Sequence, residues 1–169
     1  MTPAAGGRPV AQTQHSRAAD VSRHVVVGFD GTKRGRAAVS RAIAIAKRKG
    51  DCDIVVVCTH DRPADFSGAP FLLGRLDDAA WRREWEQETS EELEHEVLRI
   101  RLAGVEARSA CSLEDPAKML RDIAKELDAE YIVLPDDSGG LIHDLLVGSI
   151  VRRLRRSSRV PVVVVNDDR

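Results

Sequence analysis

Two short polar stretches are the places where this chain has the chemistry to bind a ligand. Asp30-Gly31-Thr32 follows an apolar run, and Gly148-Ser149 precedes a short helical pattern. A carboxylate such as that of Asp30 can accept hydrogen bonds from ribose hydroxyls or help to hold a metal ion. Backbone N–H groups at a helix N-terminus form a ready site for an anion. Each stretch has a structural alternative, because either one can simply cap the helix that follows it.

The other polar residues indicate a ligand site less specifically. Ser138, Gly139 and Gly140 form a glycine-rich stretch that could wrap a phosphate. The arginines from Arg152 to Arg159 are expected on a solvated helix face, with attraction of a phosphate or an acidic partner as the alternative. The histidines and cysteines lack metal-ligand spacing, and no enzyme signature is present. We therefore assign no catalytic residue and no metal ligand.

Alternating strands and helices must position these stretches. Short apolar, β-branched runs alternate with segments of helical periodicity. The predicted strands cover residues 24–29, 53–59, 105–111, 131–134 and 161–165, the third as a half-buried edge strand. The predicted helices begin near residues 34, 78, 116 and 149, and the second carries the apolar stripe Trp81, Trp85, Leu93, Val97 and Ile100.

This alternation predicts an α/β fold with a parallel sheet covered by helices on both faces. In such sheets, ligands bind beyond the carboxyl ends of the strands, where the strand order reverses. We therefore expect Asp30 and Gly148-Ser149 to face a common crevice. Residues 61–76 contain two prolines and two glycines and form a long loop. This loop could close over the crevice as a lid, or it could simply join the second strand to the long helix.

The composition restricts the class of protein. The chain has 169 residues, of which 43% are hydrophobic, and a net charge of −1, so its charge gives no argument for nucleic-acid binding. We predict one domain at residues 21–169 after a disordered tail at residues 1–20. No apolar run reaches the roughly 20 residues that span a membrane. Three cysteines without paired spacing fit a reducing cytoplasm.

Four segments of the chain carry a family pattern. They read VVVGFDGTKRGRAAV, DIVVVCT, EDPAKMLRDIAKELDAEYIVLP and GSIVRRLRRSSRVPVVVV. These segments resemble the universal stress protein family, over about residues 22–166. The resemblance implies a five-stranded parallel sheet of order 3-2-1-4-5, Rossmann-like and similar to the adenine nucleotide alpha hydrolases. It also implies a regulatory or binding module in stress adaptation rather than an enzyme, ATP binding with Mg²⁺ in many members, and a homodimer through the last strand. That strand is formed here by Pro161, Val162, Val163, Val164 and Val165.

The phosphate loop departs from the family pattern. ATP-binding members share G-x2-G-x9-G-[ST], whereas this chain has Pro135 and Ser138 at the first two glycine positions. Proline lacks an N–H, serine adds a Cβ atom, and Asp136-Asp137 adds negative charge near the triphosphate. Gly139 and Gly140 could allow a shifted loop to bind the phosphates in place of the two missing glycines. By the resemblance, Asp30 lies on the ribose side and the Thr59 backbone at the adenine. The residues expected to line the site are Asp30, Gly31, Thr32, Thr59, Ser138, Gly139, Gly140, Gly148 and Ser149.

Three functional hypotheses follow from these patterns. The first is a cytoplasmic regulatory module that binds an adenine nucleotide. The second is a nucleotide-independent scaffold for a protein partner, and the third is a nucleotide hydrolase.

Overall fold

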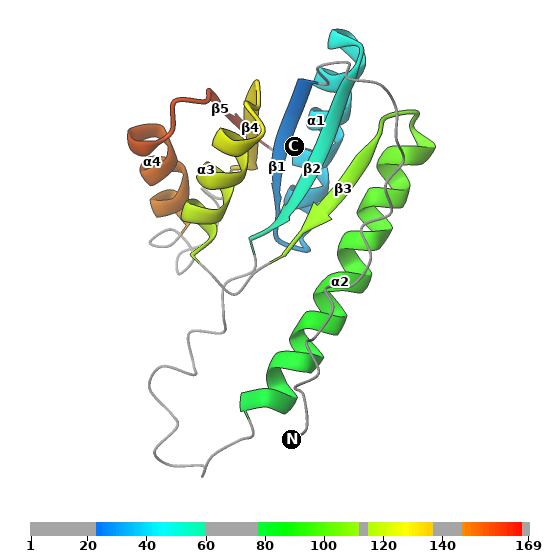
Figure 1. Ribbon diagram of the computed structural model, residues 1–169, viewed down its shortest axis with the longest axis vertical. Coiled ribbons are helices and arrows are strands. Elements are labelled where there is room, and N and C mark those ends of the chain that lie inside the picture. Colours follow the sequence, from blue (N-terminus) through cyan, green and yellow to red (C-terminus); the bar gives the residue numbers. More distant parts are fainter. Residues whose placement is uncertain (1–22, 60–77, 112–114, 137–146, 167–169) are drawn as a thin grey trace, which may run out of the picture.

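The computed structural model describes residues 23–59, 78–111, 115–136 and 147–166 (Figure 1). Strands and helices alternate along the chain in the predicted order. The predicted tail at residues 1–20, the loop at residues 61–76 and residues 138–140 lie outside the described residues. The elements are β1 (Arg23–Phe29), α1 (Lys33–Lys49), β2 (Cys52–Cys58), α2 (Asp78–Leu102), β3 (Ala107–Ala110), α3 (Pro116–Glu126), β4 (Tyr131–Pro135), α4 (Val147–Ser157) and β5 (Val162–Val165).

The five strands form one parallel sheet in the order β3-β2-β1-β4-β5, which confirms the predicted α/β fold. β1 pairs with β2 over its full length, from Arg23 opposite Cys52 to Phe29 opposite Cys58. On its other side β1 pairs with β4, where Val27 lies opposite Val133. Because β4 returns to the far side of β1, the strand order reverses between these two strands.

The helices cover both faces of the sheet, as Figure 1 shows. α1 and α2 pack on one face, and α3 and α4 pack on the other. Each strand sends alternate side chains to the two faces, so two apolar clusters result. The first includes Val25, Val27, Phe29, Ile54, Val56, Ala38, Ala42, Leu93, Val97 and Ile100. The second includes Val26, Val55, Val57, Ile132, Leu120, Ala124, Ile150 and Leu154.

Local sequence determines where the helices begin and end. The Thr32 side chain accepts a hydrogen bond from the backbone N of Gly35 at 3.1 Å and so caps α1. Gly50 ends that helix with a φ of +65°. Asp115 caps α3, because its Oδ2 atom accepts from the backbone N of Lys118 at 2.9 Å. α3 thus begins at the residue that the sequence predicts, Pro116.

The long helix α2 begins at its predicted start, Asp78. Leu93, Val97 and Ile100 are buried against the sheet, whereas the side chains of Trp81 and Trp85 lie outside the described residues. The N-terminal part of α2 projects past the edge of the sheet in Figure 1. Among the helices that the structure describes, none is long and apolar enough to cross a membrane.

The two outer strands of the sheet differ. β3 is shorter than the predicted 105–111 strand. Glu106 O accepts from β2, so the next carbonyl, that of Ala107, points outward. The Arg101 Nε and Nη2 atoms donate to this oxygen at 3.1 and 2.7 Å. β5, by contrast, consists of four half-buried valines.

Ion pairs hold the amino edge of the sheet. The Glu130 carboxylate lies 2.6 Å from Lys49 Nζ and 3.4 Å from Arg23 Nε. These contacts connect the segment before β4 to the end of α1 and the start of β1. The hydrogen bond to Glu130 raises the pKa of Lys49, whose ammonium lies 5.4 Å from the centroid of the Tyr131 ring. The charged groups at this edge thus join three packed elements.

Candidate functional site

The loop after β1 holds Asp30 in a defined orientation. The Asp30 Oδ1 atom accepts hydrogen bonds from the Thr32 backbone N at 3.0 Å and from Thr32 Oγ1 at 2.7 Å. Gly31 makes the turn with a φ of +76°, which glycine adopts without strain. Both bonds use Oδ1, and no described residue donates to Oδ2. The second oxygen of this half-buried side chain can therefore accept from a ligand hydroxyl.

The alternative in which Asp30 caps the following helix is wrong, because Thr32 is the cap of α1. The Thr32 hydroxyl donates to Asp30 and accepts from the backbone N of Gly35, so it connects the carboxylate to the helix. A Cβ atom at position 35 would collide with Asp30 Oδ1 and would lie 3.1 Å from Phe29 Cδ2. A glycine at this position is what allows the helix to approach the Asp30 turn.

Thr59 lies beside this loop at the end of β2. Its backbone N donates to Phe29 O at 2.8 Å, which extends the β1–β2 ladder past the last paired residues. Asp30 and Thr59 thus leave the sheet at adjacent positions. A Cβ atom on Gly28 would lie 2.5 Å from Leu134 Cδ2 and 3.0 Å from Thr59 Cγ2. This glycine leaves room over β1 for the side chain of Leu134 in β4 and for that of Thr59, which follows β2.

The β4 side of the same edge is built differently. Pro135 is buried as the last residue of β4, opposite Val165 of β5. The next backbone N, that of Asp136, donates to Val165 O at 2.7 Å. Gly148 and Ser149 lie in the first turn of α4, which starts at Val147. The backbone N–H groups of a first helical turn have no acceptor within the helix.

These segments lie at the same edge of the sheet, where the strand order reverses. The chain after β1 enters α1 on one face, and the chain after β4 leads to α4 on the other. We call this region the switch-point site. The hydrogen bonds join Asp30 to Thr32 and the end of β1 to Thr59. Gly148 and Ser149 lie at the start of the helix that connects β4 to β5, hence at the same edge. Ser138, Gly139 and Gly140 fall outside the described residues.

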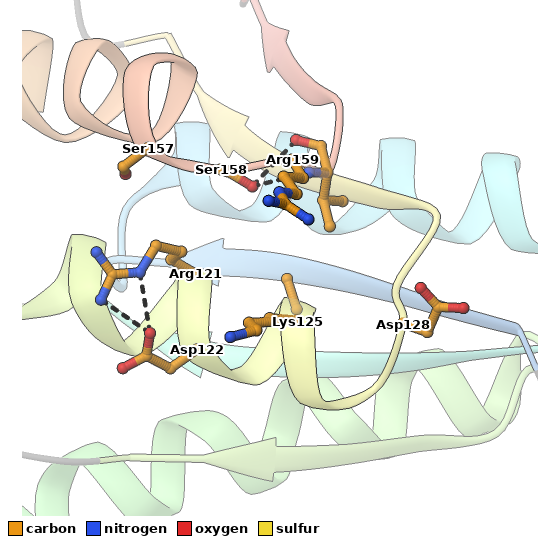
Figure 2. A pocket seen from close by; sticks show the side chains of 9 residues that line it. Arg121, Asp122, Lys125, Asp128, Ser157, Ser158 and Arg159 are labelled. Carbon is orange, nitrogen blue, oxygen red and sulfur yellow. Dashed lines mark hydrogen bonds and ion pairs between the residues drawn. The ribbon is translucent and has the colours of Figure 1, made fainter.

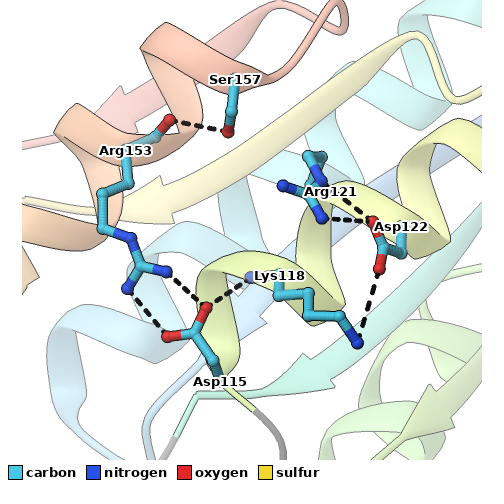
Figure 3. A network of polar contacts seen from close by, with 6 residues as sticks. All are labelled: Asp115, Lys118, Arg121, Asp122, Arg153 and Ser157. Atoms are coloured by element: carbon cyan, nitrogen blue, oxygen red, sulfur yellow. Dashed lines mark hydrogen bonds and ion pairs between the residues drawn. The ribbon is translucent and has the colours of Figure 1, made fainter.

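An ion pair holds α4 to the start of α3 (Figure 3). The Arg153 Nη1 and Nη2 atoms donate to Asp115 Oδ1 and Oδ2 at 2.8 and 2.7 Å. These bonds hold the pKa of Asp115 below its usual value. Arg152 and Arg156 are exposed, as predicted, and Arg153 is exposed but also bonded to α3. The pair therefore fixes the helix whose first turn belongs to the switch-point site.

A cavity of about 580 Å³ lies elsewhere, between the C-terminal ends of α3 and α4 (Figure 2). Ligands of parallel sheets bind at the carboxyl edge, whereas this cavity lies toward the amino edge. One of its charged groups, Arg121, is already paired with Asp122 at 2.9 Å. We therefore do not assign this cavity to the switch-point site. Its lining residues are Arg121, Asp122, Ala124, Lys125, Asp128, Ser157, Ser158, Arg159 and Val160.

Comparison with known proteins agrees with the fold. A sequence profile of the universal stress protein family matches residues 22–166. The chain belongs to the universal stress protein family. The match includes every described element from β1 to β5. No match was found among curated proteins.

Solved structures of universal stress proteins have the same architecture. One from Archaeoglobus fulgidus in complex with dAMP is 24% identical, with a TM-score of 0.61 over 86% of this chain and 98% of that one. A universal stress protein in complex with cAMP is 21% identical, with a TM-score of 0.63 over 87% and 98% of the two chains. UspA from Lactobacillus plantarum is 16% identical, with a TM-score of 0.64 over 85% and 97%.

Sequence analysis missed three contributors to the site of this universal stress protein. Gly28 interrupts an apolar strand and Gly35 lies in the first turn of a helix. Isolated glycines of this kind signal a close approach of another group, so this pattern could have identified both. The pairing of Asp115 with Arg153 joins residues 38 positions apart, and nothing in the local sequence indicates it.

Proposed function

We propose that this universal stress protein is a regulatory module that binds an adenine nucleotide at the switch-point site. The observation that carries the proposal is the Asp30 carboxylate, which Thr32 orients through Oδ1 while Oδ2 stays available to a ribose hydroxyl. Thr59 lies next to it, where the family resemblance puts the adenine. The solved complexes of universal stress proteins with dAMP and cAMP support this choice of ligand.

The phosphate side favours a nucleotide with few phosphates. Pro135 supplies no N–H, and the backbone N of Asp136 is already bonded to Val165 O. The described residues contain no group of three or more His, Cys, Asp or Glu side chains that could hold a metal ion. Mg²⁺ would therefore enter together with the phosphates of ATP rather than bind to the protein alone. We propose tighter binding of AMP than of ATP with Mg²⁺.

Calorimetric titration of the full chain with AMP, and separately with ATP and Mg²⁺, tests this function. Asp30→Asn keeps an acceptor for Thr32 but loses the charge, so its AMP affinity should fall about tenfold. Asp128→Asn, an exposed carboxylate near the amino edge, is the matched control and should bind like the parent chain. No binding heat from either nucleotide would contradict the proposal and favour the protein scaffold. Nucleotide turnover that Asp30→Asn abolishes would instead indicate a hydrolase.

We further propose that β5 joins two copies of the chain into a homodimer. The carbonyl of Pro161 accepts from Ile132 of β4 and that of Val165 accepts from Asp136, which follows β4. The alternation of a strand therefore turns the Val164 N–H outward. Its four valines are half-buried in the single chain, and pairing with a second copy would cover them further.

The three cysteines are all thiols, which supports placement in a reducing cytoplasm.

Light scattering coupled to gel filtration tests the dimer. The parent chain should elute at twice the chain mass. Val164→Pro removes the outward N–H and should give a monomer, whereas Val164→Thr retains the N–H and should remain dimeric. A parent chain that stays monomeric at high concentration would rule the dimer out.

A further inference from the structure

Two cysteines end neighbouring strands at the carboxyl edge of the sheet. β2 and β3 are parallel, and their last paired residues are Val57 and Ala110. The next residue on each strand is a cysteine, Cys58 on β2 and Cys111 just after β3. The register therefore places Cys58 opposite Cys111, although 52 residues separate them in the sequence.

Both thiols belong to the same face of the sheet. Cys58 packs in the apolar cluster beneath α1 and α2, as does Ala107 of β3. Ala110 packs against the cluster on the opposite face. Side chains alternate along a strand, so the position after Ala110 returns to the face of Cys58. Register and alternation thus agree that the two side chains are neighbours.

Their spacing suits a covalent bond. Paired positions on adjacent strands lie about 4.8 Å apart, and disulfides join residues whose Cα atoms are about 4.4–6.8 Å apart. Cys111 lies one residue beyond the last paired residue of β3. We propose that Cys58 and Cys111 form an oxidation site, which a hydroperoxide converts to an intrachain disulfide.

The different exposure of the two cysteines sets the order of the reaction. Cys111 is exposed, whereas Cys58 is 3% exposed. The Cys111 thiolate attacks one oxygen of hydrogen peroxide, the O–O bond breaks, and the second oxygen leaves as water after it takes up a proton. The resulting sulfenic acid is attacked by the Cys58 sulfur. The S–S bond forms, the S–O bond breaks, and the second water leaves with the Cys58 proton.

The disulfide would connect the ends of β2 and β3 next to the switch-point site. Thr59 directly follows Cys58, so the bond would hold the strand end that carries this residue. It would also close a loop that contains all of α2, which restricts the unfolded chain. The oxidation site depends on the two thiols alone and stands whether or not a nucleotide binds.

Thiol counting and peptide mass mapping test this proposal on the full chain. The reduced protein should show three reactive thiols when denatured. After a small excess of hydrogen peroxide the count should fall to one, and a single cross-linked peptide should contain Cys58 and Cys111. The oxidised chain should also unfold at a higher temperature than the reduced chain, and a thiol reductant should reverse both changes.

Three variants separate this proposal from general thiol oxidation. Cys52→Ala removes a buried thiol at the amino edge of β2, and this control should still form the cross-link. Cys111→Ser changes an exposed residue, and it should slow peroxide-dependent thiol loss at least tenfold. Cys58→Ala should stop at an oxidised Cys111 without a cross-link. A thiol count that stays at three, or a bond between Cys111 residues of two chains, would overturn the proposal.

Discussion

The β1 side and the β4 side of the switch-point site are built by different means. On the β1 side, Gly31, Thr32 and Gly35 lie within six residues of Asp30 and hold it through short-range hydrogen bonds and close packing. On the β4 side, the ladder with β5 continues past Pro135, and the Asp136 N–H is already bonded to Val165 O. The β1 side is therefore organised before a ligand arrives.

This difference bears on which part of a ligand determines selectivity. The base and the ribose would meet groups that the fold already orients, whereas the phosphates would meet the altered β4 side. Changes on the β1 side should affect stability and binding together, and changes on the β4 side should affect the choice among nucleotides.

Gly35→Val should have the largest effect, because its Cβ atom collides with the Asp30 carboxylate. We expect the free energy of unfolding to fall by about 1–3 kcal/mol, a typical loss for an overpacked site, and AMP binding to be lost. Urea unfolding and calorimetry measure the two effects. Ala44→Val also introduces a valine into α1, but at an exposed position, and is the control. Equal stability of the two variants would show that α1 can move away from the turn.

Thr32→Val should lower the stability and the AMP affinity less than Gly35→Val does. It removes the helix cap and the hydroxyl bond to Asp30, and loss of a cap usually costs about 1 kcal/mol. Thermal unfolding should show the loss, and AMP affinity should fall because the carboxylate is less well oriented. Thr32→Ser retains the hydroxyl and should restore both properties. A Val variant with parent-like AMP affinity would mean that the cap does not position Asp30.

Ser138→Gly tests the β4 side without touching β1. It restores one glycine of the family loop, so it should raise the affinity for ATP with Mg²⁺ roughly fivefold, as expected for one added hydrogen bond. The affinity for AMP should change little. The control is Ser90→Gly, at an exposed position of α2. Ser40 is not used because its side chain bonds to Arg99. A parallel gain for AMP and ATP would contradict the division between the two sides.

Asp115→Asn should have the smallest effect. The folded pKa of Asp115 is lowered, so its ion pair stabilises the protein above the unfolded pKa of about 3.9 and is lost as pH falls through the folded value. At neutral pH the variant should melt about 1–3 °C lower, because the side chains of Arg153 and Asp115 are 53% and 38% exposed, so that solvent screens much of the attraction. In acid the two melting curves should converge. Asp122→Asn, whose partners lie on its own helix, is the control.

Short-range patterns were enough to predict the fold. The apolar runs around Val25 and Val55 predicted buried strands, and Asp115-Pro116 predicted a helix start, because each signal depends on neighbouring residues. The role of Asp30 was harder to predict, since an aspartate before a helix is also an ordinary cap. Contacts such as Arg153 with Asp115 could not be predicted, because they arise only after α3 and α4 have packed together.

The unequal edges of the sheet bear on how far this protein can self-assemble. Arg101 occupies an outward carbonyl of β3, so a strand from another molecule cannot easily extend the sheet there. β5 offers no comparable obstacle among the described residues. If two β5 edges pair as proposed, each copy of the chain then exposes only its β3 edge, where Arg101 bonds to the outward carbonyl. Strand addition would stop at ten strands, with no route to an open fibre.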